Sequence, residues 1–263
     1  MKSPLAALPV IVAALACSHS AHADNDKFAI TLSAFRPAST TEISANGDNV
    51  MGQRIRFEDT FDLAKDDVRP RMDGMFRMGD RHRLLFNYYN LKRSRSAYLD
   101  EDLHFNGEDF SIDTEVTGRF ALSLATLSYE YALVETPTLT VGASIGAHWL
   151  DTKVSIKADD ESQLDARTRA SGGAPAIGLR FLATPGEHWR FGGTLQAFKA
   201  DVGKVDGKFE RAGVNVEYRF AQGVGVQLGY DWFRLRADYR KPQWNGSLDL
   251  RINGPTLGMT FAY

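Results

Sequence analysis

The chain contains almost no cysteine, no long apolar run after its first residues, and no large excess of either charge. Cys17 is its single cysteine, so an intrachain disulfide and a cysteine-based zinc site are both excluded. From residue 24 onward no stretch approaches the roughly 18 consecutive apolar residues that mark a spanning helix. With 31 basic and 33 acidic residues, the near balance of charge gives no basis for binding nucleic acid.

The first residues have the composition of a secretory signal peptide. Lys2 supplies a basic start, residues 4–17 are apolar, and Ala21-His22-Ala23 has the small-x-small pattern of a cleavage site. We therefore expect a signal peptide at 1–23 and one mature domain at 24–263. The mature domain would contain no cysteine, which excludes thiol catalysis as well.

A lipoprotein signal is the alternative interpretation of the same segment. In that case Cys17 would be lipidated after Ala14-Leu15-Ala16. Lipoproteins usually have leucine three residues before the cysteine, where this chain has Ala14. Cleavage after Ala23 is therefore favoured.

Alternation of apolar and polar residues dominates the rest of the chain. Between Arg211 and Phe220, for example, every second residue is apolar. A period of two predicts strands with one apolar face, and the Gly-rich, β-branched and aromatic composition shows no helical period. The expected strands are 28–35, 68–78, 83–89, 120–133, 139–149, 177–181, 189–197, 211–220, 224–232 and 248–263.

Two of these strands have an interruption in their pattern. The apolar residues of strand 120–133 change from even to odd positions near Ala125-Thr126. A β-bulge shifts the side-chain parity by one residue, so we expect a bulge at this point. A similar break between Trp149 and Leu150 means that the pattern does not decide on which face of the strand Asp151 lies.

The final strand carries the most specific pattern. Apolar residues occupy alternate positions up to the last one, at Leu257, Met259, Phe261 and Tyr263. Together with the export signal, this ending resembles the Gram-negative outer-membrane β-barrel proteins, and in particular the small OmpA/OmpX/OmpW-like ones. The resemblance implies location in the cell outer membrane and insertion by the barrel-assembly machinery, which reads such a terminal strand.

The lengths of the connections agree with this resemblance. Short turns are expected at 78–81, 135–137, 185–187 and 221–223, and long polar loops at 38–67, 94–113, 157–170, 201–207 and 239–247. Short periplasmic turns and longer external loops are typical of outer-membrane barrels. Both mature termini would then be periplasmic, which requires an even number of strands.

We therefore predict an all-β fold, a closed up-and-down antiparallel transmembrane β-barrel of ten strands. Eight strands are an alternative if a weak strand is a loop, and twelve if residues 54–63 form a hairpin. A soluble lipocalin-like barrel or β-sandwich would point its apolar face inward. The residues opposite the apolar stripe are small, polar or charged in both signs, which suits a narrow wet lumen better.

The sharpest feature of the expected lumen face is its arginine content. Eight arginines and four carboxylates share this parity, which predicts a net positive interior. Such residues form either an ion network that fills a narrow barrel or the selectivity ring of an anion-preferring pore. The set is Arg69, Arg71, Asp73, Arg77, Arg83, Glu130, Arg180, Arg190, Arg211, Glu217, Arg219 and Asp231.

Basic residues also gather near the expected outer rim, where the phosphates of lipopolysaccharide lie. Arginine suits phosphate, so outer-membrane lipid and lipopolysaccharide are expected partners. Solvated loop bases are the alternative explanation. These residues are Lys92, Arg93, Arg95, Arg234, Arg236, Arg240 and Lys241.

The chain offers little that resembles the catalytic motifs of barrel enzymes. Lipid A deacylases of this architecture have a His-x-Ser pair, which the mature chain lacks. Barrel proteases use Asp-Asp and Asp-His couples, with which Asp66-Asp67, Asp159-Asp160 and His148 with Asp151 invite comparison. Adjacent acids are common in solvated loops, and the scattered histidines do not have the spacing of a metal site.

The leading hypothesis is a non-enzymatic outer-membrane barrel with a structural or surface-binding role through its external loops. A narrow anion-preferring channel is the second hypothesis, and a barrel hydrolase is the third. We expect no cofactor, no metal and no nucleic-acid partner. The pattern does not identify an extracellular ligand.

Replacing Val216 by arginine tests this assignment of faces. Val216 is expected to face lipid near the middle of the membrane, where arginine costs about 2–4 kcal/mol. Asn215→Arg, on the lumen face, should cost much less. Chemical unfolding of both variants measures the two losses, and equal losses would contradict the assignment.

Overall fold

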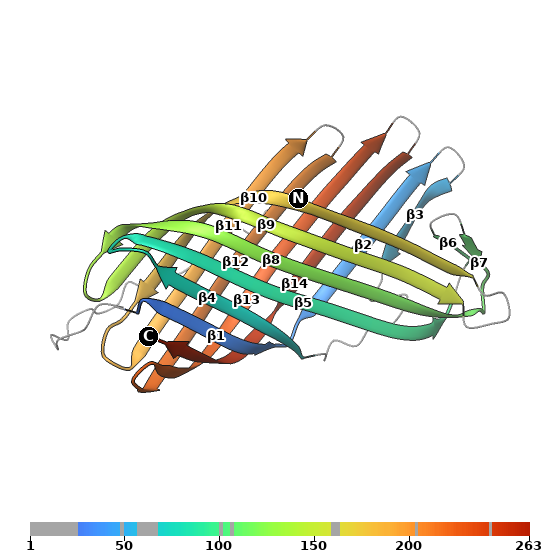
Figure 1. The fold of residues 1–263 in the computed structure, drawn as a ribbon. Helices are drawn as coiled ribbons and strands as arrows, with labels where there is room; N and C mark the ends of the chain where they lie inside the picture. The colour runs from blue at the N-terminus through green and yellow to red at the C-terminus, as the bar shows by residue number, and fades with distance from the viewer. Residues whose placement is uncertain are drawn as a thin grey trace, which may run out of the picture.

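The computed structural model describes residues 26–47, 50–56, 68–99, 102–105, 108–158, 164–202, 205–241 and 244–263. The described chain consists of antiparallel strands joined by turns, and it contains no helix that is long and apolar enough to cross a membrane. Figure 1 shows these strands as one strongly tilted, curved wall. The expected signal peptide lies outside the described residues.

Twelve strand segments make up the ten strands of a closed barrel. β1 (Phe28–Phe35) and β2 (Ala38–Gly47) both pair with β14 (Trp244–Ala262), so they are two parts of the first barrel strand. β3 (Val50–Arg56) pairs with β2, and β4 (Arg69–Arg77) pairs with β1, so β3 and β4 are two parts of the second barrel strand. The pairing of β1 with both β4 and β14 closes the barrel, which confirms the predicted fold.

The remaining barrel strands follow in sequence order, each paired with the next. A two-stranded hairpin, β6 (Leu103–Phe105) and β7 (Glu108–Phe110), stands apart from the barrel wall. The remaining barrel strands are β5 (His82–Tyr98), β8 (Glu115–Glu135), β9 (Leu139–Ala158), β10 (Asp165–Ala183), β11 (Trp189–Val202), β12 (Val205–Ala221) and β13 (Val224–Lys241).

The expected short turns are present, but most of the predictions of long loops are wrong, because strands occupy those ranges. Strand structure continues through residues 38–47 and 50–56, β5 runs on to Tyr98, and β10 already begins at Asp165. The connections between β11 and β12 and between β13 and β14 are correspondingly short. In the extensions whose side chains the structure describes, apolar residues such as Leu91 of β5 and Ala166 of β10 are buried and do not lie on the expected outer face, so the sequence pattern missed them.

β8 shows the reason most clearly. Leu122 and Leu124 are buried inside the barrel, at 0% and 4% exposure, whereas Leu127 and Tyr129 are exposed outside, at 42% and 39%. The register of β8 with β5 is nevertheless unbroken through this region. The bulge expected at Ala125-Thr126 is therefore wrong, because the apolar residues change face while the strand itself continues regularly.

The same change of face occurs around the barrel. On β14, Leu250 and Ile252 are fully buried, whereas Leu257 and Met259 are exposed. The change defines two halves. In the membrane half, which contains the chain ends and the turns 79–81, 136–138, 184–188 and 222–223, apolar side chains face outward. In the far half, which contains β2, β3 and the β6–β7 hairpin, most of the apolar side chains that the structure describes face inward.

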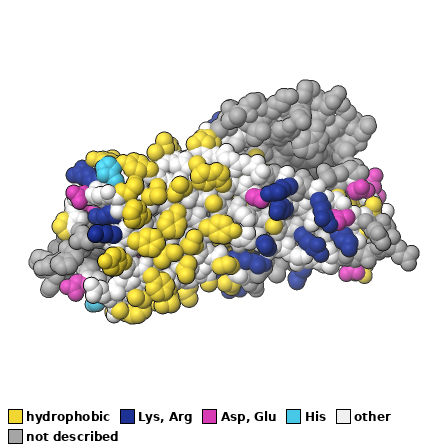
Figure 2. Space-filling view, viewed as in Figure 1, with side chains coloured by type: hydrophobic (Ala, Val, Ile, Leu, Met, Phe, Trp, Pro, Cys, Tyr) yellow, Lys and Arg dark blue, Asp and Glu magenta, His cyan; other side chains and the backbone are white. Residues whose placement is uncertain are grey.

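Each half places its apolar side chains where water is absent. In the membrane half they form the outward band that Figure 2 shows in yellow, while basic residues occupy the wall beside it. The stretch Leu139–Trp149 of β9, at about 3.3 Å per residue and a tilt of about 40°, rises roughly 25 Å, the height of the apolar band in outer-membrane barrels. Exposed aromatic residues lie at its two edges, Trp189 near the turns and Trp149 at the boundary of the halves.

In the far half the inward side chains form a continuous hydrophobic core, like that of a small filled barrel. This core packs residues from nearly every strand around the lumen. Its members are Phe35, Tyr89, Leu91, Leu99, Phe110, Val116, Phe120, Leu122, Leu124, Val154, Ile156, Ala158, Ala166, Phe209, Phe233, Leu250 and Ile252.

Candidate functional site

The interior of the membrane half holds three clusters of charged side chains, and the first is centred on Glu130 of β8. Glu130 is fully buried and accepts two hydrogen bonds of 2.7 Å from Nε and Nη2 of Arg180. Arg83 Nη1 lies 3.8 Å from Glu130 Oε1, and Arg83 Nη2 donates to both oxygens of Glu135, at 2.6 and 2.8 Å. Arg77 also lies 3.5 Å from Glu135.

A glycine on the neighbouring strand leaves room for this buried carboxylate. Gly142 of β9 faces Glu130, and a Cβ atom at this position would lie 2.4 Å from Glu130 Cδ. Only glycine therefore leaves the space that Glu130 occupies. Bidentate pairing then satisfies both oxygens of Glu130 in a dry environment.

The second cluster joins β4 to β13 across the two strands between them, through Arg71 of β4. Arg71 donates to both oxygens of Asp73, at 2.7 and 2.8 Å, and its third nitrogen bonds Asp231 of β13. Arg211 of β12 reaches the same Asp231 at 3.0 Å. Asn87 Nδ2 donates to Asp73 at 2.7 Å.

The third cluster lies at the end of the barrel where the chain termini meet. Arg219 Nε donates to Glu217 at 2.6 Å, and the two terminal nitrogens of Arg219 bind Asp26 at 2.9 and 2.5 Å. Thr260 donates to Glu217 at 3.2 Å and is itself within 2.9 Å of Thr31 Oγ1. The cluster thus ties the first residues of the barrel to β12 and β14.

Most of the residues expected in the lumen network take part in these clusters, but two stand apart from them. Arg69 donates to the backbone carbonyl of Lys92, and Arg190 lines the interior cavity described below. Two carboxylates, Asp26 and Glu135, were missed by the sequence pattern. Asp26 precedes the first expected strand, and the pairing of β8 with β9 shifts between Ala132 and Val134, which turns Glu135 inward.

The interior is therefore less positive than the sequence indicated. The eight expected arginines meet six carboxylates, namely the four expected ones together with Asp26 and Glu135. The pairing favours an ion network that fills the lumen over a positively charged ring.

The three clusters surround a cavity of about 220 Å³ inside the membrane half. The hydrophobic core of the far half ends toward this cavity in an aromatic layer, to which His148 is added. We define the layer as Phe35, Tyr89, His148, Phe209 and Phe233, which come from β1, β5, β9, β12 and β13. Tyr89 packs edge-on against Phe35 and Phe233, with ring centres 5.3 and 6.1 Å apart, and His148 lies 4.3 Å from Phe209.

His148 and Asp151 do not form the couple considered from the sequence. His148 is buried in the barrel interior, where its Nδ1 lies 2.8 Å from Thr126 Oγ1. Asp151 faces outward and pairs with Arg169 at 2.8 Å. Asp66-Asp67 and Asp159-Asp160 lie outside the described residues, and among the described ones no group of three or more potential ligands could hold a metal ion.

The basic residues expected at the outer rim are distributed over different surfaces. Arg93 is buried and donates to the carbonyl of Pro37 at 2.8 Å, whereas Lys92 is exposed on the outer wall. Arg234 pairs with Asp249 at 2.5 Å, and Arg236 and Arg251 surround the same carboxylate. The side chains of Arg240 and Lys241 lie outside the described part of the chain.

Comparison with known proteins gives the class of the molecule. No protein-family model and no curated protein matches the sequence. Among solved structures, the outer membrane protease OmpT from Escherichia coli aligns with a TM-score of 0.59 and 12% identity, covering 92% of this chain and 98% of OmpT. The translocator domain of the autotransporter NalP from Neisseria meningitidis aligns with a TM-score of 0.48 and 11% identity, covering 92% and 90%.

The toluene transporter TodX from Pseudomonas putida aligns more weakly, with a TM-score of 0.34 and 9% identity over 91% of this chain and 90% of TodX. Of the three likenesses, the one to OmpT is close enough to define a fold. The chain has the fold of an outer-membrane β-barrel. At 12% identity this likeness concerns the fold alone.

Removing the charge of Glu130 should destabilise the barrel strongly. The Glu130→Gln change leaves Arg83 and Arg180 buried with less compensating charge, and breaking a buried ion pair costs about 3–5 kcal/mol. Denaturant unfolding in detergent measures this loss. The double variant Glu130→Gln, Arg180→Gln should recover part of it, whereas Asp165→Asn on the exposed wall should change little; no recovery in the double variant would argue against the pairing.

The pairing of Asp249 should make stability depend on acid pH. A hydrogen bond from Arg234, helped by Arg251, holds the pKa of Asp249 below its ordinary value of 3.8, although partial burial opposes the shift. Because the folded pKa is the lower one, the stabilising contribution is complete above about pH 4 and is lost as the pH falls below it. Unfolding measured from pH 6 down to pH 2 should show a shallower acid loss for Asp249→Asn than for the original chain; parallel curves would contradict this.

Proposed function

We propose that this protein is a non-enzymatic, non-conducting β-barrel of the Gram-negative outer membrane. Its far half projects from the membrane as a rigid surface-binding body, and its chain ends lie in the periplasm. The observation that carries the proposal is the change of face, because it fills the projecting half with a hydrophobic core instead of an open channel. The binding surface is then the outer wall of long strands, rather than five large loops.

The orientation is supported by how far the chain extends beyond the apolar band at each end. Both described chain ends lie in the membrane half, where the strands close in turns beside the apolar band. At the other end the strands continue through the far half, and longer extensions are the external feature of such barrels. Leu257, Met259 and Phe261 of β14 point outward beside β1, where the barrel closes. We propose that the assembly machinery reads these residues and Tyr263 before closure.

A closed interior is supported by the two kinds of packing in series. The ion network occupies the lumen of the membrane half, and the aromatic layer with the core above it lies across the path. Eight arginines against six carboxylates leave an excess of two positive charges, which is small for selecting an anion. A narrow anion-preferring channel is the second candidate, favoured by Arg190 and Arg180 lining the cavity.

Planar-bilayer recording of the purified, folded chain tests the closed interior. The original chain should give no ion-selective current. A variant with Tyr89→Gly, Phe209→Gly and Phe233→Gly removes the large rings of the aromatic layer and should conduct. Steady anion-selective current from the original chain would sink the proposal and support the channel.

The solved structure of OmpT is that of a protease, so proteolysis is the enzymatic alternative to exclude. Incubation with a mixture of unstructured peptides should give no cleavage above background. Cleavage that disappears in the His148→Ala variant would contradict the non-enzymatic assignment. Retention of the folded barrel in that variant is the necessary control.

A further inference from the structure

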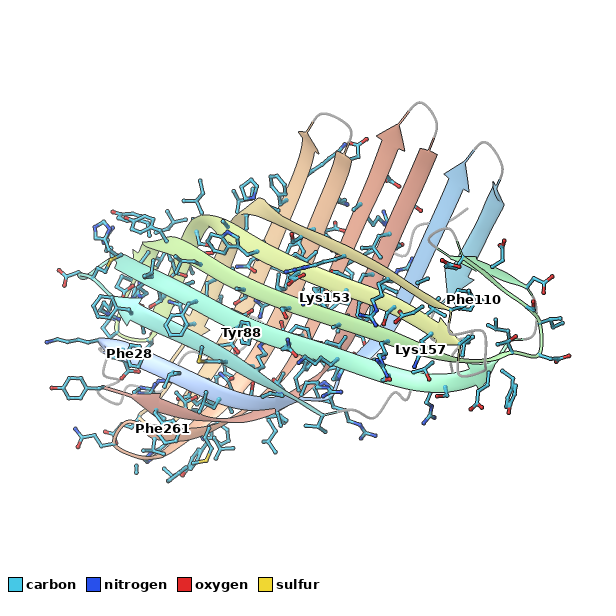
Figure 3. All side chains as sticks on the ribbon, turned by 45° about the vertical axis from the view of Figure 1, so that its right-hand side comes forward. Phe28, Tyr88, Phe110, Lys153, Lys157 and Phe261 are labelled. Atoms are coloured by element: carbon cyan, nitrogen blue, oxygen red, sulfur yellow. The ribbon has the colours of Figure 1, made fainter. Side chains whose placement is uncertain are left out.

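The outer wall formed by β5, β8, β9 and β10 carries a cluster of basic side chains just beyond the membrane half. We define this basic patch as Lys92, Arg119, Lys153, Arg167 and Arg169. The strand register places Lys92, Lys153 and Arg169 along one row across the wall, and Arg119 and Arg167 along the next row. Figure 2 shows basic side chains gathered beside the apolar band, and Figure 3 places Lys153 on this wall.

The basic patch retains a positive charge after its internal pairs are counted. Arg169 pairs with Asp151 at 2.8 Å and Arg167 pairs with Asp165. Five basic residues against these two carboxylates leave an excess of three positive charges. Among the described residues, no carboxylate lies within ion-pair distance of Lys92, Arg119 or Lys153.

The height of the patch matches the headgroup region of a membrane. Tyr88 and Trp149 mark the last outward aromatic row of the membrane half, and the row of Lys92 and Lys153 lies four residues further along β5 and β9. At about 3.4 Å per residue and a tilt of about 40°, this difference amounts to roughly 10 Å above the aromatic edge. Flexible lysine and arginine side chains can bridge such a distance toward phosphates.

A groove on the same wall connects the patch with the apolar band. It has a volume of about 510 Å³, and Tyr88, Trp149 and Arg169 line it. Small residues, among them Ala125 and Gly173, also line it. The groove therefore offers an apolar foot and a cationic head to one elongated molecule.

We propose that this wall binds a phosphorylated glycolipid of the outer leaflet, of the lipid A type, with its phosphates on the basic patch and an acyl chain in the groove. A net excess of three positive charges above an aromatic rim fits an amphiphile with a multiply phosphorylated head. The inference rests on the proposed orientation, which places the far half on the outer side of the membrane.

The opposite wall of the barrel has no such excess and supplies a matched control. On β12 to β14, Lys208, Arg234, Arg236 and Arg251 share their surface with four carboxylates. Arg236 lies four residues beyond Trp232 on β13, and Lys208 lies four residues beyond Ala212, the partner of Trp232 on β12. Lys153 lies at the same spacing from Trp149 on β9. The four carboxylates are Asp206, Glu210, Asp238 and Asp249.

Binding of fluorescent diphosphorylated lipid A to the full-length folded chain in detergent tests the site. The variant Lys92→Gln, Arg119→Gln, Lys153→Gln should weaken binding by roughly tenfold or more, and added salt should weaken the original chain toward the same level. The control variant Lys208→Gln, Arg236→Gln should bind as the original chain does. Equal affinity of the triple variant and the original chain would overturn the proposal.

Two further ligands and one variant distinguish the source of the phosphate and the role of the groove. Dephosphorylated lipid A and phosphatidylglycerol should each bind more weakly than the diphosphorylated form, and Trp149→Ala should weaken binding without abolishing the salt dependence. Phosphatidylglycerol binding as tightly as lipid A would refute the glycolipid assignment.

The orientation is tested separately by labelling. Ser96→Cys places a thiol on the exposed outer wall of β5, beyond the patch, and a membrane-impermeant maleimide should label it in intact cells. Labelling that appears only after lysis would overturn the proposed orientation and the outer-leaflet site with it. External labelling combined with unchanged lipid binding in the triple variant would overturn the site alone.

Discussion

Closure of the strand ladder is the constraint on which the rest of this structure depends. Hydrocarbon offers no partner to a backbone N–H or C=O group, so every such group in the membrane half must bond within the protein. The pairing of β1 with β14 removes the open edges that an unclosed sheet would expose. The backbone of the last residue continues this seam, since Tyr263 exchanges hydrogen bonds with Phe28 across it.

Once the wall is closed, each side-chain row has one face inside and one outside, and the surrounding medium decides which face is apolar. In the membrane half the outside is hydrocarbon, so Leu127 and Leu257 point outward and the interior holds charges. In the far half the outside is water, and the apolar rows, with Leu122 and Leu250, turn into the interior. One continuous set of strands thus forms a membrane barrel and a water-exposed barrel in series.

The two halves are also closed inside by different forces. Buried ion pairs such as Arg180 with Glu130 and Arg71 with Asp231 connect strands that are not neighbours in the sheet, and they require nearly complete pairing because an isolated buried charge is costly. The far half relies on hydrophobic packing, with the aromatic layer at the junction. The outer wall at the same junction carries the basic patch and groove, so this level is where the molecule meets lipid headgroups in our proposal.

The sequence by itself determined that the chain forms strands with two unlike faces, and its terminal strand and short turns were enough to predict a ten-stranded barrel. It also placed residues such as Arg83, Glu130 and Asp231 on the inner face. Only the tertiary structure decided that the apolar rows change sides without a bulge, that the long connections are mostly strand, and that Asp26 and Glu135 join the interior. The physical reason is that a period of two reveals a difference between faces, whereas the medium at each face and the partner across the lumen depend on the closed barrel.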